Sequence, residues 1–245
     1  MLRRPLALAA VGVLGLAACR ETGGRAVGSP STVTVGATAG TPATVPPESA
    51  PASSVVLDHR LVMIGDSLFD RPSSQLRQAF AATDYQLALH AVSGSRWSDH
   101  RDEIAAAARD RPAALVVELG TNNVLDGDFT DQDRADIDQA VSTLANNPCV
   151  LFVNAGLLNP NRPGLLTDPA WRGYAKQLQA LTESNRYLAA ALTGHPTLHL
   201  FDWDSEFNRH ADWSDDLIHV RSASASQYAD MMVKQVGDAC PVAKA

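Results

Sequence analysis

From about residue 60 onward, short apolar runs alternate with longer stretches in which apolar positions recur every three or four residues. The apolar runs predict β-strands at residues 60–64, 85–92, 114–119, 150–154 and 198–202. The periodic stretches predict helices over residues 73–82, 98–109, 131–146, 168–192 (continuous or broken) and 224–236. Strands that alternate with helices favour a parallel sheet of about five strands, covered by helices on both faces.

The first 18 residues have the pattern of an export signal. Arg3 and Arg4 precede an apolar run over residues 5–18, which is too short for a membrane-spanning helix. The run ends in Leu16-Ala17-Ala18-Cys19, which resembles the lipobox of bacterial lipoproteins. The resemblance implies cleavage before Cys19, a lipid on Cys19, and a location on the outer face of the bacterial cell membrane. The alternative is an ordinary secretory signal with an incidental cysteine.

Composition divides the rest of the chain into two parts. Residues 19–54 are rich in Gly, Ala, Thr, Ser and Pro and contain few large apolar side chains, so we expect a disordered linker. Residues 55–245 are long enough for one domain with a substantial core. No later segment is long and apolar enough to cross a membrane.

Charge narrows the choice of partners. The formal net charge is −7, and loss of residues 1–18 removes two arginines and no acidic residue, which gives −9. An acidic chain without a cluster of Lys and Arg is a poor nucleic-acid binder. We therefore expect no nucleic-acid partner, and membrane attachment through the lipid at Cys19.

The three cysteines give one further expectation. With Cys19 lipidated, Cys149 and Cys240 remain as an even pair in an oxidising compartment, where a disulfide is plausible. Two free buried thiols are the alternative. No spacing of Cys and His indicates a metal site, so we expect no metal.

Candidate chemistry begins directly after the first predicted strand. Gly65-Asp66-Ser67-Leu68 supplies a serine, and Asp216-Leu217-Ile218-His219 supplies an acid and a base far downstream. A serine hydroxyl becomes an effective nucleophile only when a base accepts its proton and a third group fixes the tautomer of that base. Position 69 is Phe, so this is not the Gly-x-Ser-x-Gly elbow of α/β-hydrolases.

Two further segments follow predicted strands in the same way. Gly94 follows the second strand, and Asn122 in Gly120-Thr121-Asn122 follows the third. Ligands of open parallel sheets bind beyond the carboxyl ends of the strands, so one crevice could collect all these residues. Gly94 and Asn122 could then donate hydrogen bonds to an oxyanion.

Taken in order, these segments resemble the four blocks of the SGNH/GDSL hydrolase family, over residues 60–236. The resemblance implies a three-layer α/β/α sandwich of the flavodoxin-like type and ester hydrolysis without metal or cofactor. It assigns Ser67 as nucleophile, His219 as base and Asp216 as its orienting acid. The oxyanion hole would comprise the Ser67 and Gly94 backbone N–H groups and the Asn122 side chain. The family often has Asp at position 123 and Pro at position 220, where this chain has Asn123 and Val220.

Several residues outside these four segments are further candidates for the site or for the core. We expect Asp66 to hydrogen-bond its own turn, and Asp215 is a rival to Asp216. Trp203 is expected in the core, whereas Trp97 and Trp213 could form a wall for stacking sugars. Arg96 could meet an anionic substrate. The remaining histidines, at positions 59, 90, 100, 195, 199 and 210, are expected on strands or the surface.

The sequence therefore predicts a monomeric, lipid-anchored serine esterase that removes small acyl groups, acetyl in particular, from cell-envelope carbohydrate. The envelope substrate rests on location and family analogy. Three alternatives stay open: an O-acetyltransferase that passes the same acyl group to a sugar hydroxyl, a long-chain lipase, and a catalytically idle binding module. A protonated histidine cannot act as base, so the activity of an enzyme should fall in acid.

Overall fold

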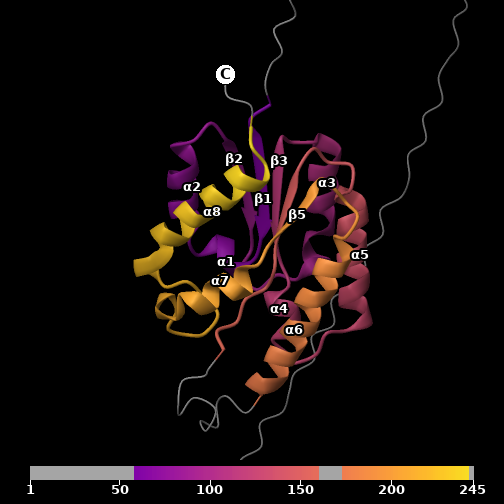
Figure 1. Ribbon diagram of the computed structural model, residues 1–245, viewed down its shortest axis with the longest axis vertical. Helices are drawn as coiled ribbons and strands as arrows, with labels where there is room; N and C mark the ends of the chain where they lie inside the picture. The colour runs from indigo at the N-terminus through magenta and orange to yellow at the C-terminus, as the bar shows by residue number, and fades with distance from the viewer. Residues whose placement is uncertain (1–57, 160–172, 243–245) are drawn as a thin grey trace, which may run out of the picture. The chain divides into compact units, whose positions relative to one another are not determined.

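Five parallel strands form one sheet in the residues that this computed structural model describes, 58–159 and 173–242 (Figure 1). The strands are β1 (Arg60–Gly65), β2 (Gln86–Ala91), β3 (Ala114–Glu118), β4 (Val150–Val153) and β5 (Leu198–Phe201). Their order across the sheet is β2-β1-β3-β4-β5. This is the flavodoxin-like order of doubly wound folds. The prediction of a parallel sheet of about five strands is confirmed.

Burial of the strands follows their position in the sheet. Every residue of the central strand β3 is buried, whereas no residue of the edge strand β2 is fully buried. In the middle of the sheet, Gly65 at the end of β1 pairs with Ala91 of β2 on one side and with Glu118 of β3 on the other. The carboxyl ends of β1, β2 and β3 are therefore level, and the segments that follow them begin next to each other.

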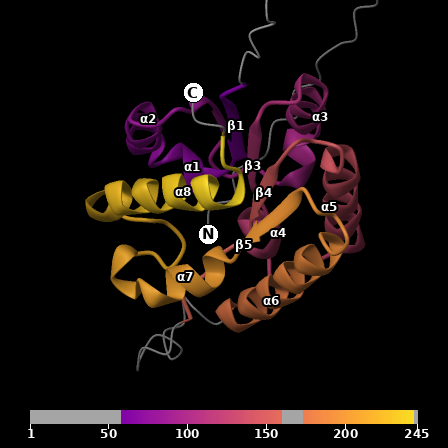
Figure 2. The ribbon, with the colours of Figure 1, turned by 45° about the horizontal axis from the view of Figure 1, so that its top comes forward.

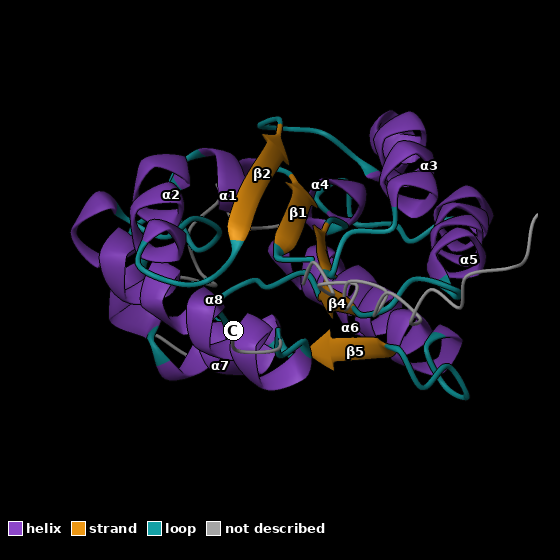
Figure 3. Ribbon diagram, turned by 90° about the horizontal axis from the view of Figure 1, so that it is seen from above, coloured by secondary structure: helices purple, strands orange, loops and turns teal. Residues whose placement is uncertain are grey.

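Helices cover both faces of this sheet. On one face lie α2 (Ser73–Ala81) and α8 (Ala225–Ala239), which pack against each other. On the other lie α3 (Arg101–Asp110), α5 (Asp131–Leu144) and α6 (Tyr174–Ala191). Figure 2 shows the two layers with the strands between them, and Figure 3 shows the same separation from above. The predicted three-layer sandwich is confirmed.

Each face of the sheet has its own apolar core. Leu76 and Phe80 of α2 pack with Met232 of α8 against one face. Ile104 of α3 and Ile137 of α5 pack against the other. Alternate residues of a strand point to opposite faces, which is why the inner strands must be apolar at nearly every position.

Several element boundaries differ from the sequence prediction. The helix predicted over residues 98–109 divides into a 3₁₀ turn, Trp97–His100, and α3. Three short helices follow strand ends without having been predicted: α1 (Ser67–Asp70), α4 (Thr121–Val124) and α7 (Trp203–Arg209). One to two turns carry too little periodicity to be recognised. The predicted helix start at Asp168-Pro169, the signal, Cys19 and the 19–54 linker lie outside the described residues.

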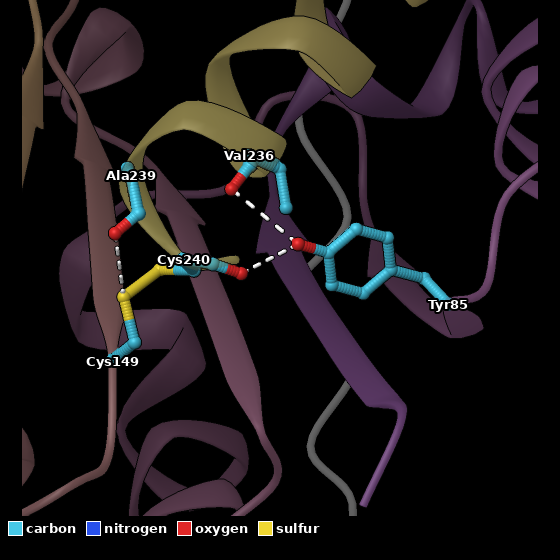
Figure 4. The surroundings of a disulfide bond; sticks show 5 residues. All are labelled: Tyr85, Cys149, Val236, Ala239 and Cys240. Carbon is cyan, nitrogen blue, oxygen red and sulfur yellow. Dashed lines mark hydrogen bonds between the residues drawn. A yellow bond between two sulfur atoms is a disulfide. The ribbon is translucent and has the colours of Figure 1, made fainter. Parts of the chain in front are cut away.

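A disulfide joins Cys149, directly before β4, to Cys240, directly after α8 (Figure 4). The two Cα atoms are 5.6 Å apart, and the bridge closes a sequence separation of 91 residues. Next to it, the Tyr85 hydroxyl donates to the carbonyl oxygen of Cys240 at 2.5 Å. The bridge thus ties α8 to the amino end of the sheet, opposite the edge where α1 and α4 lie in Figure 1.

Replacing both bridging cysteines by serine should destabilise the domain without affecting the opposite edge of the sheet. A cross-link over this sequence separation restricts the unfolded chain, so we expect its loss to lower the free energy of unfolding by about 2–5 kcal/mol. Denaturant unfolding of C149S/C240S beside the wild type checks this. A free energy of unfolding unchanged in the double variant would contradict it.

Asp204, on α7, should make stability depend on pH. Burial raises the pKa of Asp204 from 3.8 to about 6. A hydrogen bond from the Leu157 N–H opposes this rise, and the charge of Asp202 adds to it. A carboxyl whose pKa is higher in the folded state stabilises the fold at low pH, and this contribution is lost as pH rises through 6. Between pH 5 and 8 the wild type should lose about 1 kcal/mol that Asp204→Asn does not lose. Equal losses in denaturant unfolding of the two proteins would contradict this.

Candidate active site

The turn after β1 places Ser67 at the carboxyl edge of the sheet. Asp66 caps α1 through its Oδ1, which accepts from the Leu68 N–H at 3.0 Å, and Ser67 is the first residue of the helix. A Cβ at Gly65 would lie 2.6 Å from the ring of Phe69 and 2.9 Å from the Glu118 carbonyl oxygen. Only glycine therefore lets β1 turn into α1 this close to β3. As expected, Asp66 bonds its own turn.

Ser67, His219 and Asp216 form a continuous hydrogen-bonded chain. The Ser67 Oγ lies 2.9 Å from His219 Nε2, and His219 Nδ1 lies 2.7 Å from Asp216 Oδ2. Because the Asp216 carboxylate only accepts, Nδ1 carries the hydrogen and Nε2 faces the serine as an acceptor. The structure thus brings together the three residues named as triad members, with spacing suited to proton transfer from serine to histidine.

The loop between Asp216 and His219 is shaped by the aspartate itself. Its Oδ1 accepts from the backbone N–H of His219 at 2.8 Å and of Ile218 at 3.1 Å, while Leu217 adopts a left-handed φ of 69°. Burial opposes ionisation of Asp216, but the hydrogen bonds from His219 and Ile218 outweigh it and lower its pKa. Asp216 is therefore held as a carboxylate that faces the imidazole.

Asp215 takes no part in this chain of hydrogen bonds. Its side chain is 79% exposed and lies 3.9 Å from Arg221. Besides His219, the Asp216 carboxylate has Arg71 close by, with Arg71 Nη1 3.6 Å from Asp216 Oδ2. Of the two rival acids, only Asp216 contacts His219.

Gly94 and Asn122 also reach this edge, from β2 and β3. Gly94 has a φ of 84°, and a Cβ there would meet nothing within 4 Å, so the backbone lies open to an incoming ligand. The Asn122 Nδ2 donates to Asp66 Oδ2 at 2.8 Å and to the Ser95 carbonyl oxygen at 3.0 Å. Both amide hydrogens of Asn122 are thus engaged, whereas the described residues provide no acceptor for the Ser67 and Gly94 amides.

Two buried side chains behind these groups were missed or misplaced by the sequence analysis. Glu118 is fully buried at the end of β3, and its Oε2 accepts from the Asp66 N–H at 3.3 Å. His100, expected on a strand or the surface, is only 2% exposed in the 3₁₀ turn, and its Nε2 lies 2.8 Å from the Ser95 Oγ. A lone acid in the apolar run of β3 was the available signal for Glu118. His100 gave none, because its burial follows from the 3₁₀ turn.

The aromatic candidates lie in the core. Trp203 is fully buried, as expected. Trp97 is 2% exposed and packs against Phe152, and Trp213 is 7% exposed and stacks on the His210 ring. The suggestion that Trp97 and Trp213 form a wall for stacking sugars is therefore wrong.

Arg96 and Asn123 make local contacts. Arg96 Nη2 lies 2.7 Å from Asp126 Oδ2, with both side chains exposed. Asn123 is buried between the Trp97 N–H, which donates to its Oδ1, and Asp133, which accepts from its Nδ2. Asn123, which departs from the family pattern, thus links the 3₁₀ turn to α5, and no hydrogen bond joins it to the triad.

A hollow of about 330 Å³ adjoins the outer side of His219. Its lining includes Arg71, Gln75, Asp216 and Arg221. Two arginines and two acids, Asp215 among them, give this wall a mixed charge. The hollow offers room next to the triad for part of a polar substrate.

Two features are absent from the part of the chain that the structure describes. No helix there is long and apolar enough to cross a membrane. Nor do the described parts of the chain contain a cluster of three or more His, Cys, Asp or Glu side chains placed to hold a metal ion.

Known structures share this fold at low sequence identity. The C-terminal catalytic domain of the peptidoglycan O-acetyltransferase OatA of Streptococcus pneumoniae aligns with a TM-score of 0.56 and 18% identity, over 76% of this chain and 97% of that one. The acetylxylan esterase Axe2 of Geobacillus stearothermophilus aligns with a TM-score of 0.55 and 14% identity, over 73% and 94%. A lipase/acylhydrolase of Enterococcus faecalis aligns with a TM-score of 0.56 and 14% identity, over 76% and 100%.

The sequence comparisons are more specific about family. No curated protein matches the chain. Residues 63–224, however, match the model of the GDSL-like lipase/acylhydrolase family, and this range extends from β1 through the Asp216–His219 segment to the start of α8. The chain therefore belongs to the GDSL-like lipase/acylhydrolase family of ester hydrolases.

Proposed function

We propose that this protein is an exported serine esterase that hydrolyses small acyl esters, acetyl esters in particular, through an acyl-enzyme on Ser67. The observation that carries the proposal is the pair of contacts at His219, 2.9 Å from Nε2 to the Ser67 Oγ and 2.7 Å from Nδ1 to the Asp216 Oδ2. A serine, a base and an orienting acid in this geometry are the requirements of nucleophilic acyl transfer. A catalytically idle binding module would not need them.

The reaction would proceed in two balanced halves. The Ser67 Oγ attacks the ester carbonyl carbon while His219 Nε2 takes the hydroxyl proton, and the tetrahedral intermediate then expels the alcohol, which receives that proton. Water next attacks the acyl-serine and gives its proton to Nε2, and collapse of the second intermediate releases the acid and returns the proton to Ser67. Asp216 stabilises the imidazolium in each half.

Negative charge on the carbonyl oxygen would be stabilised by three donors. The Ser67 and Gly94 backbone N–H groups are free for this purpose. Asn122 can contribute if the hydrogen that it donates to the Ser95 carbonyl oxygen is shared with the oxyanion, while the other hydrogen of the planar amide stays on Asp66. Donors that act only on the transition state raise kcat, and each typically contributes about 10²–10³ in rate.

An O-acetyltransferase is the second candidate. It would use the same acyl-enzyme and replace water by a sugar hydroxyl. The fold that this chain shares with the OatA domain favours it, as the fold shared with the acetylxylan esterase Axe2 favours hydrolysis of acetylated carbohydrate. Both candidates place an acetylated cell-envelope carbohydrate on one side of the reaction.

The proposal includes attachment of the enzyme to the membrane through Cys19. A lipid on Cys19 would hold the enzyme at the outer face of the bacterial membrane, where such carbohydrates occur. Cys19→Ser should abolish incorporation of a labelled fatty acid into the chain and release it from the membrane fraction. Unchanged labelling in that variant would exclude Cys19 as the attachment site.

The experiment that tests the function compares activated acetyl, butyryl and octanoyl esters of one alcohol with the purified full chain, with and without an oligosaccharide acceptor. We expect kcat/KM to be highest for the acetyl ester. Free acetate as the main product supports the esterase, and acetylated oligosaccharide the transferase. No turnover of any ester by the folded protein, with or without acceptor, would contradict both.

A further inference from the structure

Two carboxyl groups lie buried directly behind the candidate nucleophile, and the acyl-transfer steps use neither of them. Asp66 and Glu118 are both fully buried. Asp66 directly follows β1, and Glu118 is the last residue of the neighbouring strand β3, where it pairs with Gly65. The Glu118 Oε2 accepts from the Asp66 backbone N–H. The second oxygen of Glu118, Oε1, is buried and has no hydrogen-bond partner among the described residues.

Two carboxyl groups that are buried next to each other retain a proton. Two carboxylates in contact at a buried position cannot both be ionised, because each lacks solvation and repels the other. Burial and the neighbouring charge of Asp66 raise the pKa of Glu118 well above its usual range. The other titratable groups that face the pair are His219 and Tyr228, and neither forms a buried ion pair with Glu118. The pair therefore holds one proton, predominantly on Glu118.

The Asp66 side chain contacts both the nucleophile turn and the Asn122 amide. Its Oδ1 accepts from the Leu68 N–H in the nucleophile turn, and its Oδ2 accepts from Asn122 Nδ2 at 2.8 Å. A carboxylate is a stronger acceptor than a neutral acid and can accept on both oxygens. Asp66 can fix the turn and the amide together only while it remains ionised, with the proton on its neighbour.

We propose that Glu118 is a positioning residue: its buried side chain accepts from the Asp66 N–H and so holds the Asp66 carboxylate where that carboxylate fixes the Asn122 amide at the oxyanion hole. This inference rests on the proposed acyl chemistry at Ser67. Glu118 never touches the substrate, and its effect reaches the reaction through Asp66 and Asn122.

The test compares Glu118→Gln with Glu118→Met, two neutral side chains of similar volume. Glutamine retains an oxygen that accepts from the Asp66 N–H, whereas methionine offers that N–H no acceptor. We expect E118Q to keep kcat for an activated acetyl ester within about threefold of wild type. E118M should lower kcat by about 10- to 100-fold, with KM within about threefold, because a misplaced oxyanion donor affects the transition state and not substrate binding.

A variant of Asn122 shows whether Glu118 affects kcat through the Asn122 amide. If Glu118 acts through Asn122, the E118M/N122A double variant should be no slower than N122A alone. A purely structural role for Glu118 predicts instead that losses multiply, and thermal unfolding of each variant shows whether it is folded. Equal kcat in E118M and wild type would overturn the proposal. An equal loss in folded E118Q and E118M would overturn it too, because it would mean that Glu118 acts as a charged carboxylate.

A spectroscopic arm keeps the proposal testable if E118M does not fold or the wild type hydrolyses no ester. The infrared carbonyl band of a buried protonated carboxylic acid should be present in the wild type at neutral pH and absent in E118Q. Absence of that band from the wild type would overturn the shared proton. An inactive wild type that shows the band would instead overturn the proposed ester chemistry and leave the proton on Glu118 established.

Discussion

Replacing Ser67 by alanine should lower kcat for a small acetyl ester by about 10⁴-fold or more. The variant loses the only hydroxyl within hydrogen-bonding distance of His219 Nε2 among the described residues, so no acyl-enzyme can form. What remains is stabilisation of the oxyanion for direct attack by water, a residual that typically exceeds the uncatalysed rate by about 10³–10⁴. The measurement is the steady-state rate of ester hydrolysis by the purified variant.

A matched control separates this effect from damage to the fold. Ser142 lies exposed on α5, and its hydroxyl donates to the Gln139 carbonyl oxygen, so Ser142→Ala should keep kcat within about twofold. Ser67 is a small residue at the start of a helix, and alanine there should leave thermal unfolding almost unchanged. Wild-type turnover by a folded Ser67→Ala protein would remove Ser67 from the mechanism.

Asp216→Asn is expected to have the second-largest effect, a loss of about 10⁴-fold in kcat. An asparagine can present its NH₂ group to His219 Nδ1, which then accepts a hydrogen bond and leaves the proton on Nε2. In that tautomer Nε2 cannot accept the Ser67 proton, even though the geometry is intact. Because Asp216 also accepts from two backbone N–H groups through Oδ1, the asparagine oxygen can retain those contacts and preserve the loop.

The neighbouring acid supplies the control for Asp216. Asp215→Asn removes the same charge one residue away, at a side chain that is 79% exposed and 3.9 Å from Arg221. We expect its kcat to stay within about twofold of wild type. If Asp215→Asn lost activity while Asp216→Asn did not, the assignment of the orienting acid would be wrong.

Periodicity in the sequence was sufficient to predict the sheet and its main helices. The run at residues 114–119 is continuously apolar except for one acid, which is the pattern of a central strand covered on both faces, and β3 is that strand. The short helices that carry the site were not predicted, because α1 and α4 have four residues each. Their positions depend on caps and on the strands that they follow.

The site was predictable in its contacting residues and less so in their support. The order of the motifs placed Ser67, Asp216 and His219 together, because parallel strands bring their carboxyl ends to one edge. The motifs could not show that Glu118 lies against Asp66, since that contact depends on the register between β1 and β3. Nor could they place Trp97 in the core, because its burial follows from the 3₁₀ turn after β2.

Covalent trapping tests the central claim most directly. The full chain would be mixed with a saturating activated acetyl ester, quenched in acid within the first turnovers, digested and analysed by mass spectrometry. We predict a single acetyl group on the peptide that contains Ser67, formed in the wild type and absent from Ser67→Ala. Turnover of the ester with no acetyl group on that peptide, or with the group on another residue, would contradict the account.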